Sequence, residues 1–98
     1  MYGVIGKMHA QPGARDELVA ILLEGVSGMP GCLSYVVAND VSDPDAIWVS
    51  EVWVDEEAHA ASLELPSVRD AIDRGRPLIA GFGERFVTQP VGGHGLVS

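Results

Sequence analysis

Residues 46–54 read Ala-Ile-Trp-Val-Ser-Glu-Val-Trp-Val, a run rich in β-branched and aromatic side chains that predicts a β-strand. Side chains alternate across a strand, so the run divides into two faces. They are Ile47, Val49, Glu51 and Trp53 on one side, and Trp48, Ser50, Val52 and Val54 on the other. Neither face is as polar as the water-facing side of an antiparallel sheet should be. Both sides of this sheet are therefore expected to be covered.

The segments around this strand predict the order β-α-β-β-α-β. The expected strands are residues 2–10, 32–38, 46–54 and 84–89, and the first helix is 15–27. A second helix begins after Asp55, a good N-cap, and continues in a second piece from Pro66 to about residue 75. Residues 76–83 are expected to be a connection. With right-handed crossovers this order is an α+β, ferredoxin-like arrangement: a four-stranded antiparallel sheet with the helices on one face.

Length and composition limit the organisation of the chain and its partners. The 98 residues predict one domain over 1–91, followed by a flexible Gly-rich tail over 92–98. The net charge of −8 argues against nucleic acid and anionic membranes, because binding these relies on clustered Lys and Arg. No apolar run approaches the roughly 18 residues of a membrane span, and no signal peptide is visible. With the single cysteine, Cys32, these features predict a cytoplasmic protein.

The uncovered face of the sheet predicts a homodimer. A chain this short buries only about 60–65% of its unfolded surface, so it gains from association. Since the helices cover one face, a second copy of the same sheet is the simplest cover for the other.

Four segments carry a resemblance to a known family. They are Pro30-Gly31-Cys32-Leu33-Ser34-Tyr35, Glu51-Val52-Trp53, Asp55-Glu56-Glu57-Ala58 and Arg76-Pro77-Leu78-Ile79. With them the chain resembles the antibiotic biosynthesis monooxygenase family, dimeric α+β barrels that include quinol monooxygenases. The resemblance implies oxidation of a dihydroxy aromatic or anthrone-like ring by dioxygen, with no metal and no flavin. Such chemistry needs an apolar pocket, a proton acceptor and a donor beside the developing oxyanion.

Two departures from the haem-degrading relatives in this family predict that haem is not bound. Those relatives place a histidine iron ligand nine residues after the strand tryptophan, where this chain has Ser62. They also carry an asparagine in the first strand, where this chain has Gly6. No metal site is expected either, because His9, His59 and His94 are scattered over strand, helix and tail.

The candidate site residues follow from the chemistry of the side chains and from the family resemblance. The first choice of proton acceptor is His59, which ionises near neutral pH, and the second is Glu51, which burial must first tune. Trp53 is expected to form a wall for an aromatic substrate, with Tyr35, Ser62 and Gly6 completing the substrate site. Each has a structural alternative: Trp53 and Tyr35 as packed aromatics, Glu51 in an ion pair, and His59 as a half-exposed helix residue.

Two further functional classes stay open. The first is a non-catalytic module that binds a small molecule or serves in a stress response, since the chain has no obligatory catalytic constellation. The second is an isomerase or cyclase, because fold alone does not determine function.

Overall fold

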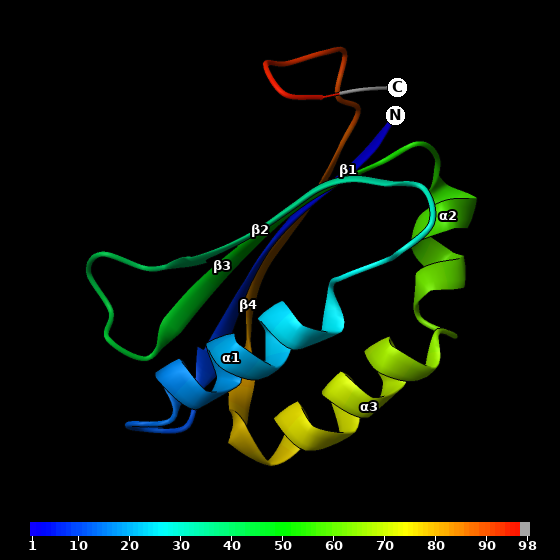
Figure 1. Ribbon diagram of the computed structural model, residues 1–98. Helices are drawn as coiled ribbons and strands as arrows, with labels where there is room; N and C mark the ends of the chain where they lie inside the picture. Colours follow the sequence, from blue (N-terminus) through cyan, green and yellow to red (C-terminus); the bar gives the residue numbers. More distant parts are fainter. Residues whose placement is uncertain (97–98) are drawn as a thin grey trace.

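The computed structural model describes residues 1–96 and confirms the ferredoxin-like fold class (Figure 1). The elements follow one another as β1 (Tyr2–Ala10), α1 (Arg15–Gly25), β2 (Cys32–Asn39), β3 (Ala46–Trp53), α2 (Glu56–Ser62), α3 (Pro66–Gly75), the 3-10 helix η1 (Arg76–Leu78) and β4 (Ile79–Thr88). The strands form one antiparallel sheet in the order β2-β3-β1-β4.

The core lies between the sheet and the helices, which all pack on one side of it (Figure 1). Ile47 and Val49 of β3 are buried against Leu18 of α1. Gly25 lets α1 approach α3 closely, because a Cβ there would lie 2.7 Å from the Cβ of Ala71. This two-layer packing leaves the other face of the sheet without a helix.

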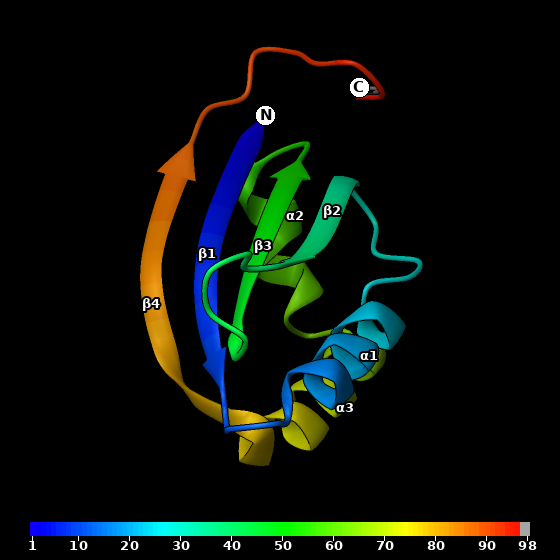
Figure 2. The ribbon, with the colours of Figure 1, turned by 90° about the vertical axis from the view of Figure 1, so that its left-hand side faces the viewer.

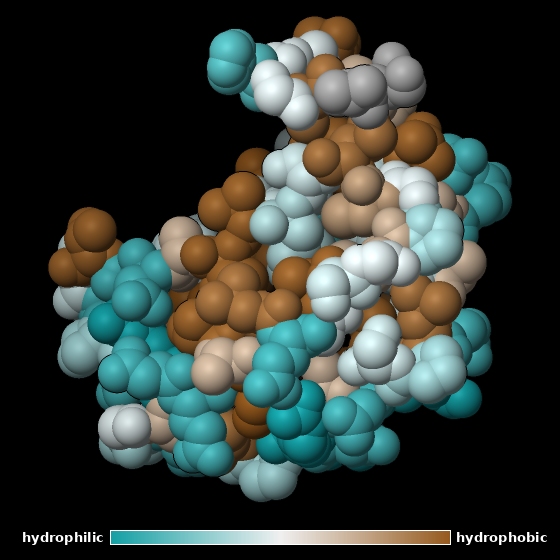
Figure 3. All heavy atoms as spheres, in the orientation of Figure 1, coloured by the Kyte–Doolittle hydropathy of each residue, from teal (hydrophilic) through white to brown (hydrophobic). Residues whose placement is uncertain are grey.

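We call this second side of the sheet the open face, and Figure 2 shows it toward the viewer with no helix in front of it. Apolar side chains remain exposed on it, among them Ile5, Val36 and Phe86, with exposed fractions of 37%, 52% and 52%. In the view of Figure 3, apolar side chains also gather around β2 and between β2 and α1, while polar ones follow the lower end of the molecule. The two-sided apolar pattern of residues 46–54 therefore corresponds to one buried face and one open face.

The last strand begins earlier than the sequence predicted. β4 starts at Ile79 instead of residue 84, directly after η1. Its pairing with β1 shifts register twice, between the partners of Gly6 and Met8 and between those of His9 and Ala10. Such bulges, together with Gly81 and Gly83, interrupt the alternation that marks a strand in a sequence.

The shifts in register also change which side chains share a face. Phe82 pairs with Met8 on the helix side, whereas Phe86 pairs with Ile5 on the open face. A regular strand would place residues four apart on the same side. A shift in β2 likewise sets Cys32 opposite Trp53, on the other face of the sheet from Ser34, which lies opposite Val52.

A smaller correction concerns α1, which ends at Gly25, two residues before the predicted end. Gly28, with φ of 71°, follows in the connection to β2.

Asp55 caps α2 as the sequence predicted, and its carboxylate accepts a hydrogen bond from the backbone N–H of Ala58 at 2.8 Å. We expect Asp55→Ala to lower the free energy of unfolding by about 1 kcal/mol, because this amide loses its partner. Asp55→Asn keeps an acceptor and should retain most of the stability. Urea denaturation measures both variants, and an equal loss in Asn and Ala would contradict the capping role.

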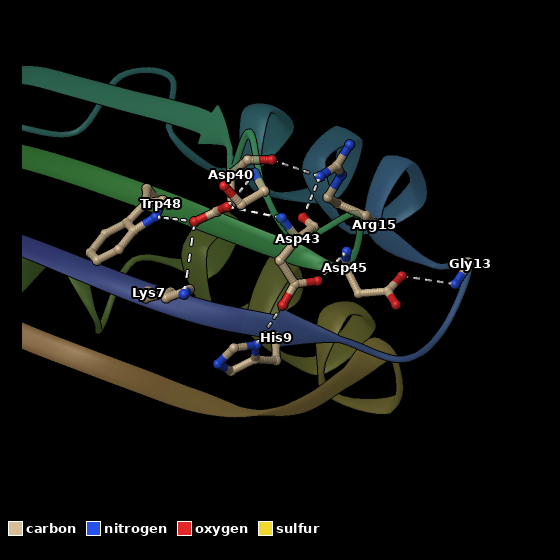
Figure 4. A network of polar contacts seen from close by, with 9 residues as sticks. Lys7, His9, Gly13, Arg15, Asp40, Asp43, Asp45 and Trp48 are labelled. Atoms are coloured by element: carbon tan, nitrogen blue, oxygen red, sulfur yellow. Dashed lines mark hydrogen bonds and ion pairs between the residues drawn. The ribbon is translucent and has the colours of Figure 1, made fainter.

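A polar network fixes the hairpin between β2 and β3 (Figure 4). The indole Nε1 of Trp48 donates to Oδ2 of Asp40 at 2.8 Å, and the backbone amides of Ser42 and Asp43 donate to Oδ1. These hydrogen bonds, with the charge of Lys7 3.8 Å away, lower the pKa of Asp40 to about 2. The network holds Trp48 in place on the open face.

The low pKa of Asp40 predicts a pH dependence of stability. An aspartate in an unfolded chain has a pKa of about 3.9, so the folded state favours the ionised form. The stabilisation is complete above that value and is lost as the pH falls toward 2. Asp40→Asn should therefore reduce the slope of the unfolding free energy against pH between pH 5 and 2. Equal slopes in the wild type and the variant would contradict the assignment.

Candidate functional site

A cavity of about 340 Å³ lies between the helix side of the sheet and helices α1 and α3. Its lining is apolar except for three polar side chains and one indole, and these are Tyr35, Glu51, Ser62 and Trp53. No lysine, arginine or histidine within residues 1–96 lines it. Glu51 is therefore the only carboxylate among the described residues that line it.

Trp53 and Glu51 are held together at the end of β3. The Trp53 side chain is almost completely buried, with 1% exposed, and its indole Nε1 donates to Oε1 of Glu51 at 3.0 Å. The two residues share a strand face because they are two positions apart. Burial and the hydrogen bond together give the aromatic ring and the carboxylate one arrangement, and both border the cavity.

His59 lies beside this pair on α2. Its Nε2 is 3.7 Å from Oε1 of Glu51, and its ring meets the edge of Trp53 with centroids 5.5 Å apart. On another side it contacts the ring of Tyr2, with centroids 5.4 Å apart. Since His59 does not line the cavity itself, it reaches the cavity through Glu51.

Tyr35 adds a hydroxyl from the neighbouring strand. It lies directly opposite Glu51 in the pairing of β2 with β3, so both side chains are on the helix side. Burial raises the pKa of Tyr35, and the charges of Glu51 and Cys32 raise it further. The hydroxyl thus stays protonated at neutral pH and can donate a hydrogen bond to an oxygen in the cavity.

Of the remaining predicted site residues, Ser62 lines the cavity and Gly6 does not. Ser62 is buried and lines the cavity, but its hydroxyl donates to the backbone oxygen of His59 at 2.6 Å. Gly6 is not part of the lining, although a Cβ at this position would meet no atom within 4 Å. Five of the six predicted site residues therefore lie on the cavity or in contact with Glu51, and Gly6 stands apart beside open space.

Several residues of the site were not predicted from the sequence. Tyr2 contacts His59 from the first strand, and the cavity is also lined by Leu63 just after α2, Ile72 of α3 and Phe82 of β4. The aromatic ring of Phe82 was the available signal, but the bulges in β4 conceal the side of the sheet on which it lies.

Other ionisable side chains lie outside this site. His9 is on β1 with its Nδ1 3.9 Å from Asp43, and Arg74 pairs with Glu24 and Asp70. Across residues 1–96, no three His, Cys, Asp or Glu side chains converge in the way that would hold a metal ion. In the same part of the chain, no helix is both long and apolar enough to cross a membrane.

The cavity thus joins three functions in one place. The indole of Trp53 offers a flat wall, the carboxylate of Glu51 offers a proton acceptor next to an imidazole, and Tyr35 offers a neutral donor. An apolar surrounding strengthens each polar interaction inside it. Such a site can bind an uncharged aromatic ring and take a proton from one of its hydroxyl groups.

Comparison with known proteins identifies the family. Residues 1–74 match the model of the family described as "Antibiotic biosynthesis monooxygenase". The comparison with curated proteins gives no match. Among solved structures, a protein from Chloroflexus aurantiacus J-10-fl, whose name assigns it to the antibiotic biosynthesis monooxygenases, is 67% identical over 98% of each chain, with a TM-score of 0.95.

More distant structures share the fold. A protein from Deinococcus radiodurans with a similar name is 24% identical over the full length of both chains, with a TM-score of 0.78. One from Nitrosomonas europaea is 14% identical and has a TM-score of 0.83, covering 94% of this chain and all of its own. The family match and the two-layer fold around the cavity lead to one conclusion: this chain belongs to the antibiotic biosynthesis monooxygenase family.

Proposed function

We propose that the protein is a cofactor-independent monooxygenase that oxidises a quinol-like or polyphenolic aromatic with dioxygen. The observation that carries the proposal is the contact of Glu51 with both Trp53 and His59 at the edge of an apolar cavity. A carboxylate in such a place can take a phenolic proton. Trp53 would stack against the ring whose hydroxyl group loses that proton.

The reaction begins with transfer of a phenolic proton to the pair formed by Glu51 and His59. Sequence reasoning placed His59 first, whereas the geometry favours Glu51 as the group that meets the substrate, with His59 receiving the proton from it. The resulting phenolate is electron-rich, and Tyr35 would donate a hydrogen bond to its oxygen. The role of Ser62 is to close the cavity wall at the end of α2.

The oxygen chemistry then balances without a further reactant. The phenolate passes one electron to dioxygen, and the two radicals combine into a ring hydroperoxide. Cleavage of its O–O bond leaves one oxygen on the ring and releases the other as water, with protons returned from the Glu51–His59 pair. In sum, one simple hydroquinone and one dioxygen give one hydroxyquinone and one water.

Oxygen uptake with a panel of hydroquinones, catechols and anthrones tests this function. We expect at least one compound to be consumed well above its uncatalysed rate. If none is, the non-catalytic alternative replaces the enzyme, because the hydrogen bond from Trp53 to Glu51 also has a purely structural use. In that case the cavity would still bind an aromatic molecule, and calorimetry would detect it.

We also propose that two copies associate through the open face. Exposed apolar side chains on that face support this arrangement, and the helices leave it uncovered (Figure 2).

We further propose that the protein is located in the cytoplasm. Its single cysteine, Cys32, is a half-buried free thiol, which suits this reducing compartment.

A further inference from the structure

Three large apolar side chains that line the cavity are also exposed to solvent. They are Leu63 at the end of α2, Ile72 on α3 and Phe82 on β4, with exposed fractions of 47%, 42% and 73%. We call these three residues the rim. Because each side chain contacts both the cavity and the solvent, the rim marks the place where the cavity opens.

The rim lies on the opposite side of the sheet from the open face. Phe82 pairs with Met8, another lining residue, while the exposed Phe86 of the same strand pairs with Ile5 on the open face. The bulges in β4 produce this division. Association of a second copy through the open face therefore does not account for the apolar surface of the rim.

The size and charge of the cavity limit what can cross the rim. A volume of about 340 Å³ is at the small end of ligand pockets, which suits a ring system and little more. The lining offers no cation to a carboxylate or phosphate, and Glu51 repels either group. Any further part of the ligand must leave through the opening, where Leu63, Ile72 and Phe82 present apolar surface.

From these observations we infer that the substrate is an uncharged hydroquinone with an apolar side chain, whose ring occupies the cavity and whose chain lies across Leu63, Ile72 and Phe82. This inference rests on the proposed function for the identity of the ring. It adds the part of the molecule outside the cavity. The rim residues would determine specificity without contact with the reacting atoms.

Equilibrium binding of an alkyl series tests the inference. Hydroquinones with linear chains of zero to eight carbons would be titrated by calorimetry without oxygen, so that no turnover occurs. Partial burial of each CH2 group on the rim should tighten binding about twofold per carbon over the first four to six carbons. An affinity that does not change with chain length overturns the inference, including the case in which a partner chain already covers the rim.

A matched pair of variants distinguishes binding of the alkyl chain at the rim from non-specific apolar binding elsewhere on the surface. Leu63→Ser removes a rim side chain, and Leu23→Ser removes a leucine of α1 that is 53% exposed and does not line the cavity. Leu63→Ser and Phe82→Ser should each flatten the dependence on chain length, whereas Leu23→Ser should preserve it. A dependence that survives in both rim variants contradicts the inference.

The binding experiment and the oxygen-uptake experiment can fail independently of each other. If the dependence on chain length holds but no oxygen is consumed, the rim binds the side chain of a ligand that the protein does not oxidise. If chain-free hydroquinones are oxidised and the affinity is flat, the monooxygenase proposal survives and the rim inference fails.

Discussion

Replacement of Glu51 by Gln is expected to lower kcat for hydroquinone oxidation by about 100-fold or more, the range typical of a lost general base. The amide keeps an oxygen that can accept the hydrogen bond from Trp53, so the cavity should retain its shape. His59→Ala should cause a loss of similar size. It removes the imidazole nitrogen that lies 3.7 Å from Glu51 and that would receive the proton from it. Oxygen uptake over pH 6–8 measures both variants.

The matched control is His9→Ala, since His9 lies on β1 away from the cavity, beside Asp43. Its activity should equal that of the wild type. If His59→Ala keeps full oxygen consumption across this pH range, His59 is a spectator. If Glu51→Gln does so as well, the cavity acts only by confining a substrate that ionises on its own.

A charge on the open face should separate the proposed dimer. Val52 of β3 pairs with Gly3 and Ser34 on that face, so Val52→Asp would bring two unpaired carboxylates into the expected interface. We expect the dissociation constant to rise about 100-fold or more, because a buried charge without a partner is costly. Sedimentation at micromolar concentration measures the change.

The control for this variant is Val41→Asp, in the hairpin, where the valine is fully exposed. It should leave the proposed dimer intact. A wild-type protein that sediments only as a monomer would contradict the proposed interface, which should bury roughly 800 Å² or more on each copy.

Much of the fold could be predicted because local signals agreed with the tertiary structure. The alternation of residues 46–54 matches the burial of Ile47, Val49 and Trp53, and Asp55 and Pro66 mark the starts of α2 and α3. β4 could not be predicted in full, because bulges arise from pairing with β1 and leave no period in the sequence.

The candidate site could likewise be predicted only where it depends on local sequence patterns. Glu51 and Trp53 share a strand, so their proximity follows from alternation. That His59 contacts Glu51 while standing outside the cavity depends on how α2 packs against β3, which no local pattern encodes. The contact of Tyr2 with His59 and the position of Phe82 on the rim depend likewise on long-range pairing.

A monooxygenase transfers one oxygen atom of dioxygen to its substrate. Turnover of a hydroquinone under ¹⁸O₂, followed by mass spectrometry of the product and an assay for hydrogen peroxide, tests it most directly. We expect one ¹⁸O atom in each hydroxyquinone, one dioxygen consumed per product and no peroxide. An unlabelled quinone with an equal amount of hydrogen peroxide would contradict it, because the protein would then transfer electrons to dioxygen without incorporating oxygen.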